Sequence, residues 1–350
     1  MNATTPGKEP TTIEDMDWRL PPFWGRGILL AWWLGLGAYY YSQPEMSFRW
    51  ELAFEILPNP LNLTAQAIGC LAKALLALGG FGFMGISVGG WCLAKLGLQI
   101  EDRIESLGFR LGLGWGIVGC LMAVLGLLKL WYVGPVMVLL AALTLWTALA
   151  GPKANYAGTP LGGGTPWNAF DYALAALLVL FAAFNLLCTL IPEIFYDALT
   201  YHLALPDLYW RRHGFFPTPD NVFSGLPLLI QMLYGLALPI GGEELTHALH
   251  WSLGVAAAFM AYASGRRLGG RRAGLLAALF FYSNPLVGVM SWKSGVDLGT
   301  AFFQLLAVQA LVLASTERAA RREWLIVSGA LCGFAMGTKY QAWPLAGVMV

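Results

Sequence analysis

The chain has 350 residues, of which 57% are hydrophobic and only 12% are charged, and its formal net charge is +1. A soluble domain averages about 25% charged residues, so the composition excludes an ordinary soluble domain and indicates a polytopic membrane protein. A net charge this close to zero also argues against a nucleic-acid-binding role. The sequence therefore predicts an all-α fold, a polytopic bundle of transmembrane helices.

Nine apolar runs are predicted to span the membrane. A polar segment, residues 1–26, precedes the first run and lacks the apolar core of a signal peptide. We therefore expect this segment to be a cytoplasmic tail and the first helix to be an uncleaved anchor. The predicted spans, in chain order, are 27–43, 72–92, 111–130, 133–150, 170–191, 246–264, 273–291, 297–314 and 324–345.

A glycine-rich stretch divides these spans into two sections. Residues 157–165 read Ala-Gly-Thr-Pro-Leu-Gly-Gly-Gly-Thr, a composition typical of a flexible linker. We place the linker at 151–168. The four helices before it, within 27–150, form a membrane section whose role the sequence does not indicate, and 169–350 form a second section.

The apolar run 226–240 is too short to be a span by length alone. Its 15 residues give ~22 Å of helix, whereas the hydrocarbon core is about 30 Å thick. If this run lies at the interface, 14 of the 21 Lys and Arg residues fall on one side and five on the other. Positive charge gathers on the cytoplasmic side, so we predict that 192–245 is one extracytoplasmic loop bearing interfacial helices.

This loop is rich in side chains that bind sugars and phosphates. On a helix, Glu193, Asp197 and Tyr201 would share one face, because they are four residues apart. The loop also carries His202, Arg211 and Arg212. The alternative is an amphipathic helix at the interface that uses its aromatic residues only as anchors.

Two charged residues further along the chain are also candidates. Asp297 opens a predicted span, where it is either a helix cap or a site carboxylate on the same side as Asp197. We predict that Asp197 and Asp297 converge on one cavity at the outer interface. Lys339 lies 15 residues beyond Trp324, ~22 Å along the predicted helix. In the outer third of the membrane a lysine either extends to the interface or meets an anion such as a lipid phosphate.

The order of several motifs resembles the membrane-embedded GT-C glycosyltransferases. These motifs are Tyr-Asp-Ala-Leu-Thr-Tyr-His-Leu-Ala-Leu-Pro at 196–206, Phe-Ser-Gly-Leu-Pro at 223–227, the outer Asp297, and Gly-Thr-Lys-Tyr at 337–340. The nearest branch is the bacterial group related to protein mannosyltransferases and aminoarabinose transferases. The resemblance covers residues of about 168–350.

The resemblance implies a reaction and roles for the candidates. A sugar on polyprenyl phosphate would be transferred, with inversion, to a hydroxyl of a lipid, glycan or protein acceptor outside the cytoplasm. This would take place in the bacterial inner membrane. Asp197 would be the general base, and Asp297 would position the acceptor or a divalent metal, which only some members use. The substrate-binding candidates are Tyr201, His202, Arg211, Arg212, Lys293, Lys339 and Tyr340.

The chain differs from this family in its four leading helices and in its end at Val350 after five family-type helices. We therefore expect a truncated catalytic section, with an inactive fragment as the alternative. The other hypotheses are a multi-pass transporter or lipid flippase and a non-catalytic membrane scaffold. Intramembrane charges also mark transport paths. Transporters, however, tend to carry inverted repeats, which this sequence does not show.

Overall fold

The computed structural model describes residues 65–100, 102–151 and 166–349, with isolated positions between 27 and 38. The predicted tail 1–26, most of the predicted span 27–43 and most of the linker 151–168 lie outside the described residues. Every element of the described part is helical. The elements are α3 (Ala65–Lys95), α4 (Arg103–Leu127), α5 (Val133–Ala150), α6 (Ala169–Cys188), η3 (Ala198–His202), α7 (Ala204–Arg211), η4 (Val222–Gly225), α8 (Leu229–Tyr282), α9 (Pro285–Ser291), α10 (Asp297–Thr316), η5 (Arg318–Ala320), α11 (Arg321–Thr338), η6 (Tyr340–Ala342) and α12 (Trp343–Met349).

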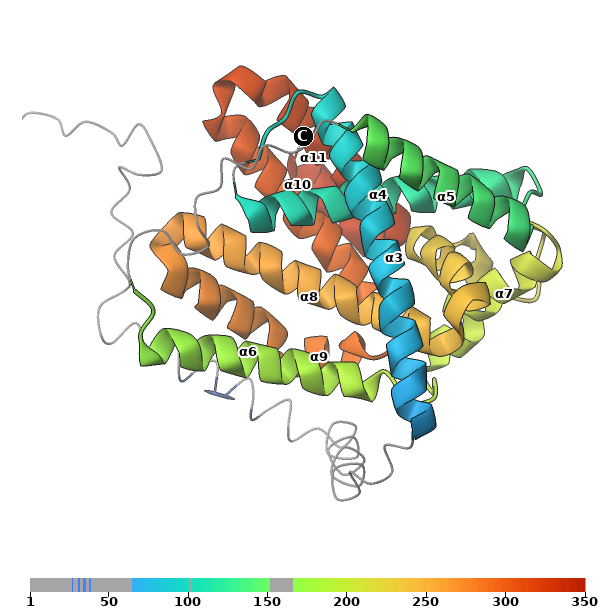
Figure 1. Ribbon diagram of the computed structural model, residues 1–350, viewed down its shortest axis with the longest axis horizontal. Helices are drawn as coiled ribbons and strands as arrows, with labels where there is room; N and C mark the ends of the chain where they lie inside the picture. Colours follow the sequence, from blue (N-terminus) through green and yellow to red (C-terminus); the bar gives the residue numbers. More distant parts are fainter. Residues whose placement is uncertain are drawn as a thin grey trace, which may run out of the picture.

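The helices form a bundle of the kind the sequence predicts (Figure 1). In the described residues, five helices are long and apolar enough to cross a membrane, or six if the bent pair of α8 and α9 counts as one span. The five are α3 from Ile68, α4, α5, α6 and α10. The predicted fold class, a polytopic helical bundle, is confirmed.

Two glycine pairs divide α8 into three straight segments, 229–240, 243–268 and 271–282. Gly242 has a φ of 65° and Gly270 a φ of 76°, values that side chains with a Cβ rarely adopt. The first break separates the short run 226–240 from the predicted span 246–264. The second lies in the arginine-rich hairpin, as the sequence predicts.

Two predicted spans are interrupted, so neither forms the continuous helix that the sequence predicts. The span 273–291 bends by 68° between α8 and α9, because Asn284 caps α9 and Pro285 occupies its first turn. The span 324–345 ends early: α11 stops at Thr338, and Lys339 is extended with φ −153° and ψ 133°. Pro344 has no N–H to continue the helical ladder through this point.

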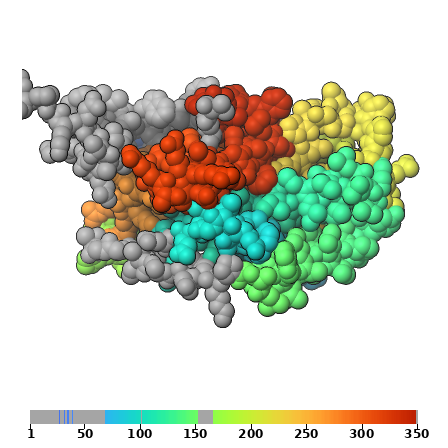
Figure 2. Space-filling model, turned by 90° about the horizontal axis from the view of Figure 1, so that it is seen from above, coloured from blue at the N-terminus to red at the C-terminus, as the bar shows by residue number. Residues whose placement is uncertain are grey.

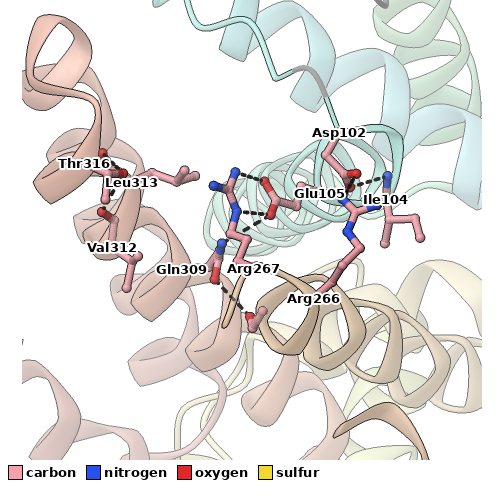
Figure 3. Close-up of polar contacts among 10 residues, drawn as sticks. Asp102, Ile104, Glu105, Arg266, Arg267, Gln309, Val312, Leu313 and Thr316 are labelled. Atoms are coloured by element: carbon pink, nitrogen blue, oxygen red, sulfur yellow. Dashed lines mark hydrogen bonds and ion pairs between the residues drawn. The ribbon is translucent and has the colours of Figure 1, made fainter. Parts of the chain in front are cut away.

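The polar contacts of the bundle gather at two ends. At the first, which we call the arginine end, the arginines of the α8 hairpin meet the acids that open two helices. Arg267 donates to the buried Glu105 carboxylate through its Nε and Nη2 atoms, and Arg266 pairs with Asp102, the N-cap of α4 (Figure 3). Asp171 in the first turn of α6 accepts from Arg271 at 2.6 Å and from Arg272 at 2.9 Å. These contacts hold the first turns of α4 and α6 against the α8 hairpin.

The opposite end contains the segments 189–228 and 292–297, and we call it the loop end. In Figure 1 it carries α7 at the right, while the α8 hairpin lies at the left. The first segment of α8 bonds within the loop end: Gln231 contacts His202, and the Tyr234 hydroxyl donates to the Gly295 carbonyl. These contacts support the interpretation that 229–240 does not cross the bundle.

Helix α4 packs into the middle of the bundle through glycines. A Cβ added to Gly108, Gly112 or Gly116 would collide with a side chain of another helix, and the partners are Met260, Leu306 and Phe334. Glycines spaced by four on one face allow helices to approach closely. The turn after α4 also reaches the loop end, where the buried Trp131 packs on Tyr209 and Phe215. In Figure 2 the teal and green surface of the section before the linker borders the yellow surface of the section after it. The section before the linker is therefore packed directly on the section after it.

The two ends predict a labelling pattern in intact membranes. Single cysteines at Arg211, in the loop end, and at Leu268, in the arginine end, should react with an impermeant maleimide from opposite sides. Leu268 and the control position Val222 are 52% and 81% exposed, so a cysteine at either position is accessible to the reagent. A cysteine at Val222 is the matched control and should behave as one at Arg211. Labelling of Arg211→Cys and Leu268→Cys from the same side would contradict the topology.

Candidate functional site

Asp197 and Tyr201 lie on a short π-helical turn at the loop end. The charge of the Asp197 carboxylate acts on the Tyr201 hydroxyl, as expected for two residues that share a face of this turn. Burial, followed by the charge of Asp197, raises the pKa of Tyr201 to about 12, and Asp297 and Tyr340 contribute to the shift. The structure therefore brings both candidate acids within electrostatic reach of one phenol. π-Helical turns occur frequently at functional sites.

Glu193 does not share this face, contrary to the prediction. Residues 192–195 are not helical, and the helical turn begins only at Tyr196. Glu193 instead points into the bundle, and its side chain is 2% exposed.

Lys339 and Asp297 form an ion pair. Lys339 Nζ lies 2.5 Å from Asp297 Oδ1, and the two side chains are 29% and 45% exposed. Lys339 follows the end of α11 rather than lying within a helix, so the predicted position inside a continuous span is wrong. In the structure the anion beside Lys339 is the carboxylate of Asp297, and the predicted contact with a lipid phosphate stays a prediction. The site therefore presents a partly exposed ammonium group next to a partly exposed carboxylate.

His202 is buried beside this ion pair. Its Nδ1 lies 2.8 Å from Nε2 of Gln231, and the residues are 2% and 1% exposed. Burial, followed by the neighbouring His250, lowers the pKa of His202 to about 3, while Asp297 opposes the shift. His202 is therefore a neutral hydrogen-bonding group at physiological pH.

A buried acid–histidine pair lies beneath these residues, and the sequence analysis did not predict it. His247 Nε2 lies 3.0 Å from Glu193 Oε2, and His247 Nδ1 lies 2.9 Å from the Thr189 carbonyl. Both ring nitrogens therefore face oxygen atoms, which hold the ring from both sides. The backbone N–H of Ser294 donates to the same Glu193 oxygen at 2.8 Å. Glu193 thus ties the end of α6 and the second segment of α8 to the loop before Asp297.

The signal for this pair was present in the sequence. Thr246, His247 and His250 interrupt a predicted span, and ionisable residues within spans are rare and functional by default. His250 also supports the site: its Nδ1 donates to the Met290 carbonyl at 2.8 Å, and its Nε2 accepts from the Leu298 N–H at 3.3 Å. It therefore holds the first turn of α10, which begins with Asp297.

Glu193 should also make the fold sensitive to acid. Burial alone would raise its pKa, but His247 and the backbone N–H groups of Ser294 and Phe195 lower it from 4.5 to about 2. A lowered pKa stabilises the fold above the unfolded value, and this stability is lost as the pH falls from about 4.5 towards 2. Breaking a buried ion pair costs about 3–5 kcal/mol.

We therefore expect Glu193→Gln to lower the unfolding temperature in detergent strongly at pH 7. The difference from the unmodified protein should shrink as the pH falls below 4.5. Asp220→Asn, at an exposed acid of the same loop, is the control and should leave the unfolding temperature nearly unchanged. A pH-independent difference for Glu193→Gln would mean that the ion pair is not its cause.

The remaining candidates lie in different surroundings. Lys293 is 1% exposed and lies over Phe195 and Trp292, at 4.6 Å and 5.6 Å from the ring centroids. Arg211 pairs with Asp207 at 2.8 Å on the exposed face of α7, and Arg212 lies over the Phe216 ring. Tyr340 is 51% exposed and follows Lys339 directly. Lys293 is thus buried within the loop end, while both arginines contact other residues of the segment 207–216.

The donor set does not favour a bound metal. Within 65–100, 102–151 and 166–349, no group of three or more His, Cys, Asp or Glu side chains could hold a metal ion. Asp297, the predicted metal candidate, has Lys339 as its neighbour, and a cation next to a carboxylate suits an anionic ligand better than a second cation.

The bundle and its polar end define an integral membrane protein with ionisable groups gathered at one end. The comparisons with known proteins agree with this class: residues 227–350 match the family described as dolichyl-phosphate-mannose-protein mannosyltransferase. The match confirms the resemblance to GT-C membrane glycosyltransferases over that part of the chain, and at the level of the family it indicates a membrane glycosyltransferase that uses a polyprenyl-phosphate sugar donor. No curated protein and no solved structure matches the chain.

Proposed function

We propose that the protein transfers a sugar from a polyprenyl-phosphate donor to an acceptor hydroxyl, with inversion, at the extracytoplasmic face of the bacterial inner membrane. The observation that carries this proposal is the loop end, where Asp197 and the Asp297 of the Asp297–Lys339 ion pair both lie within electrostatic reach of Tyr201. Glycosyl transfer from a phosphate needs a base at the acceptor and a cation at the leaving group.

In the transfer step, Asp197 acts at the acceptor hydroxyl and Lys339 acts at the leaving phosphate. The acceptor oxygen attacks the anomeric carbon on the side opposite the phosphate, and its proton passes to the carboxylate of Asp197. The bond between the anomeric carbon and the phosphate oxygen breaks, and the polyprenyl phosphate leaves with the bonding electrons. Lys339 stabilises the added negative charge on this phosphate.

The ion pair gives Asp297 two roles in succession. Before the donor binds, Asp297 holds Lys339 at the site. A phosphate that approaches Lys339 competes with this carboxylate, which is then free to accept a hydrogen bond from an acceptor or sugar hydroxyl. Tyr201, His202 and Tyr340 supply further hydrogen-bonding groups, and Lys293 orders the loop through its packing on Phe195.

The buried Glu193–His247 pair helps to fix the positions of Asp197 and Asp297. Glu193 contacts both the loop that leads to Asp197 and Ser294, three residues before Asp297. A reacting geometry that is misplaced by about 1 Å can cost on the order of 100-fold in rate. The Glu193–His247 pair therefore serves to position the acids rather than to react.

The test follows the sugar–phosphate bond of the donor. Membranes that contain the protein receive a polyprenyl-phosphate sugar with a labelled sugar, and native membrane lipid, glycan and protein serve as acceptors. We expect the label to leave the donor and to appear in an acid-stable product. A flippase would move the donor across the membrane with this bond intact, and a scaffold would change neither its position nor its bond. Either of these outcomes would contradict the proposal.

A further inference from the structure

The contact between Gln231 and His202 is unusual because it is buried and isolated. Gln231 lies on the first segment of α8, is 1% exposed, and places its amide nitrogen 2.8 Å from His202 Nδ1. An amide nitrogen only donates hydrogen bonds, so Nδ1 accepts. The ring proton of the neutral imidazole is then on Nε2, which is the nitrogen left to face a ligand.

Stability alone does not explain this glutamine. Its carbonyl oxygen Oε1 is buried and has no hydrogen-bond partner in the described part of the chain. A buried acceptor without a partner costs about 1–3 kcal/mol. A leucine at this position would avoid that cost. The amide is therefore retained for its one bond, the bond to His202.

The charged groups around His202 show what the bond achieves. Asp297 and Glu193 favour a proton on the ring, whereas His250 and Lys339 disfavour it. These groups come from α10, the loop after α6, α8 and the residue after α11. Burial outweighs the two anions and keeps the ring neutral, so one ring nitrogen carries a proton and the other accepts. The N–H that Gln231 donates to Nδ1 selects Nε2 as the protonated nitrogen.

We propose that Gln231 is a positioning residue that holds His202 as the Nε2–H tautomer, so that His202 presents one neutral hydrogen-bond donor to an oxygen of the phosphate-bearing ligand at Asp297 and Lys339. The identity of that ligand rests on the proposed function. With Nδ1 occupied and Nε2 already protonated, His202 cannot take the proton of the acceptor hydroxyl. The proton then goes to Asp197, and His202 contributes only as a donor.

The first test reads the tautomer directly and needs no substrate. The protein is labelled with ¹⁵N-histidine in detergent micelles, and two-bond ¹H–¹⁵N correlations are recorded from pH 5 to 8. The His202 signals are assigned by their loss in His202→Asn. We expect the pattern of a neutral ring with the proton on Nε2 at every pH. A proton on Nδ1, or titration of His202 within this range, would overturn the proposal.

Two variants separate the amide from its surroundings. Gln231→Glu has nearly the same shape but accepts a hydrogen bond, so the proton should move to Nδ1 and His202 should begin to titrate between pH 5 and 8. Gln231→Leu should leave a mixture of the two tautomers. Gln341→Glu, at an exposed glutamine near Lys339, is the control and should keep the unmodified pattern. An unchanged tautomer in both Gln231 variants would also overturn the proposal.

The second test uses the transfer reaction. Gln231→Leu should lower kcat by about 10–100-fold, as is usual for a group that orients a functional histidine. Gln231→Glu should add a new titration of His202 to the pH profile of kcat. If the protein showed no transfer but the expected tautomer, the proposed function would fail and the role of Gln231 would stand. If it transferred sugar with the other tautomer, only the role of Gln231 would fail.

Discussion

Replacing Asp197 by Asn is expected to lower kcat for sugar transfer by about 10²–10⁴-fold, the usual contribution of a general base. Asn has the same shape as Asp, but its amide cannot take a proton. The helical turn that carries the residue should therefore remain folded. The measurement is the initial rate of label transfer from the polyprenyl-phosphate sugar at saturating donor, together with the unfolding temperature.

The matched control is Asp207→Asn in the same loop. Asp207 is 52% exposed and pairs with Arg211 on the surface of α7, and a surface ion pair contributes only about 0–1 kcal/mol. We expect this variant to transfer sugar at nearly the unmodified rate. A full rate in Asp197→Asn would remove Asp197 from the role of base and leave Asp297 as the acid to test next.

Much of the bundle follows from the sequence because hydrophobic length and charge bias are local signals. The predicted span 133–150 coincides with α5, and 170–191 differs from α6 by only a few residues. The glycine pair at 241–242 separates the short run 226–240 from the next predicted span. Breaks within apolar runs are harder to predict, because Asn284, Pro285 and Pro344 lie between residues that are apolar enough to be in a membrane.

The site was predictable only in part, because its support is tertiary. Asp197, Tyr201 and Asp297 carry motif signals, and in the structure each of the two acids lies within electrostatic reach of Tyr201. The bond between Glu193 and His247 spans 54 positions, and that between His202 and Gln231 spans 29. No local pattern pairs such residues. The polar residues inside the predicted span 246–264 showed that a partner was needed, and the fold identifies Glu193 as that partner.

The role of the section before the linker was also beyond the sequence. Its glycines are common to many membrane helices, and nothing in their spacing names the partner helix. In the structure they face Met260, Leu306 and Phe334 of three different helices. Gly126 at the end of α4 accepts the backbone hydrogen bond of Phe215, which lies in the loop end. The section therefore helps to hold the loop that carries the proposed base.

Replacing Lys339 by Met is expected to lower kcat/KM for the donor by about 10²–10³-fold, the cost of losing one group that stabilises developing negative charge. Met keeps the length and apolar packing of lysine but cannot pair with Asp297 or with a phosphate. Lys339→Arg should retain part of the activity, because the charge remains while the geometry of the donor atoms differs. The measurement is the rate of donor cleavage over a range of donor concentrations.

The result separates a role at the phosphate from a structural tie between α10 and α11. The Asp297–Lys339 ion pair is partly exposed, so its loss should change the unfolding temperature little. Lys73→Met, at an exposed lysine of α3, is the matched control for removing a cation from the bundle and should leave donor cleavage unchanged. If Lys339→Met cleaved the donor at the unmodified rate, Lys339 would be an anchor for Asp297 alone. The cation at the leaving group would then have to be Arg211 or Arg212, which would require α7 to release Asp207 or Phe216 when the donor binds.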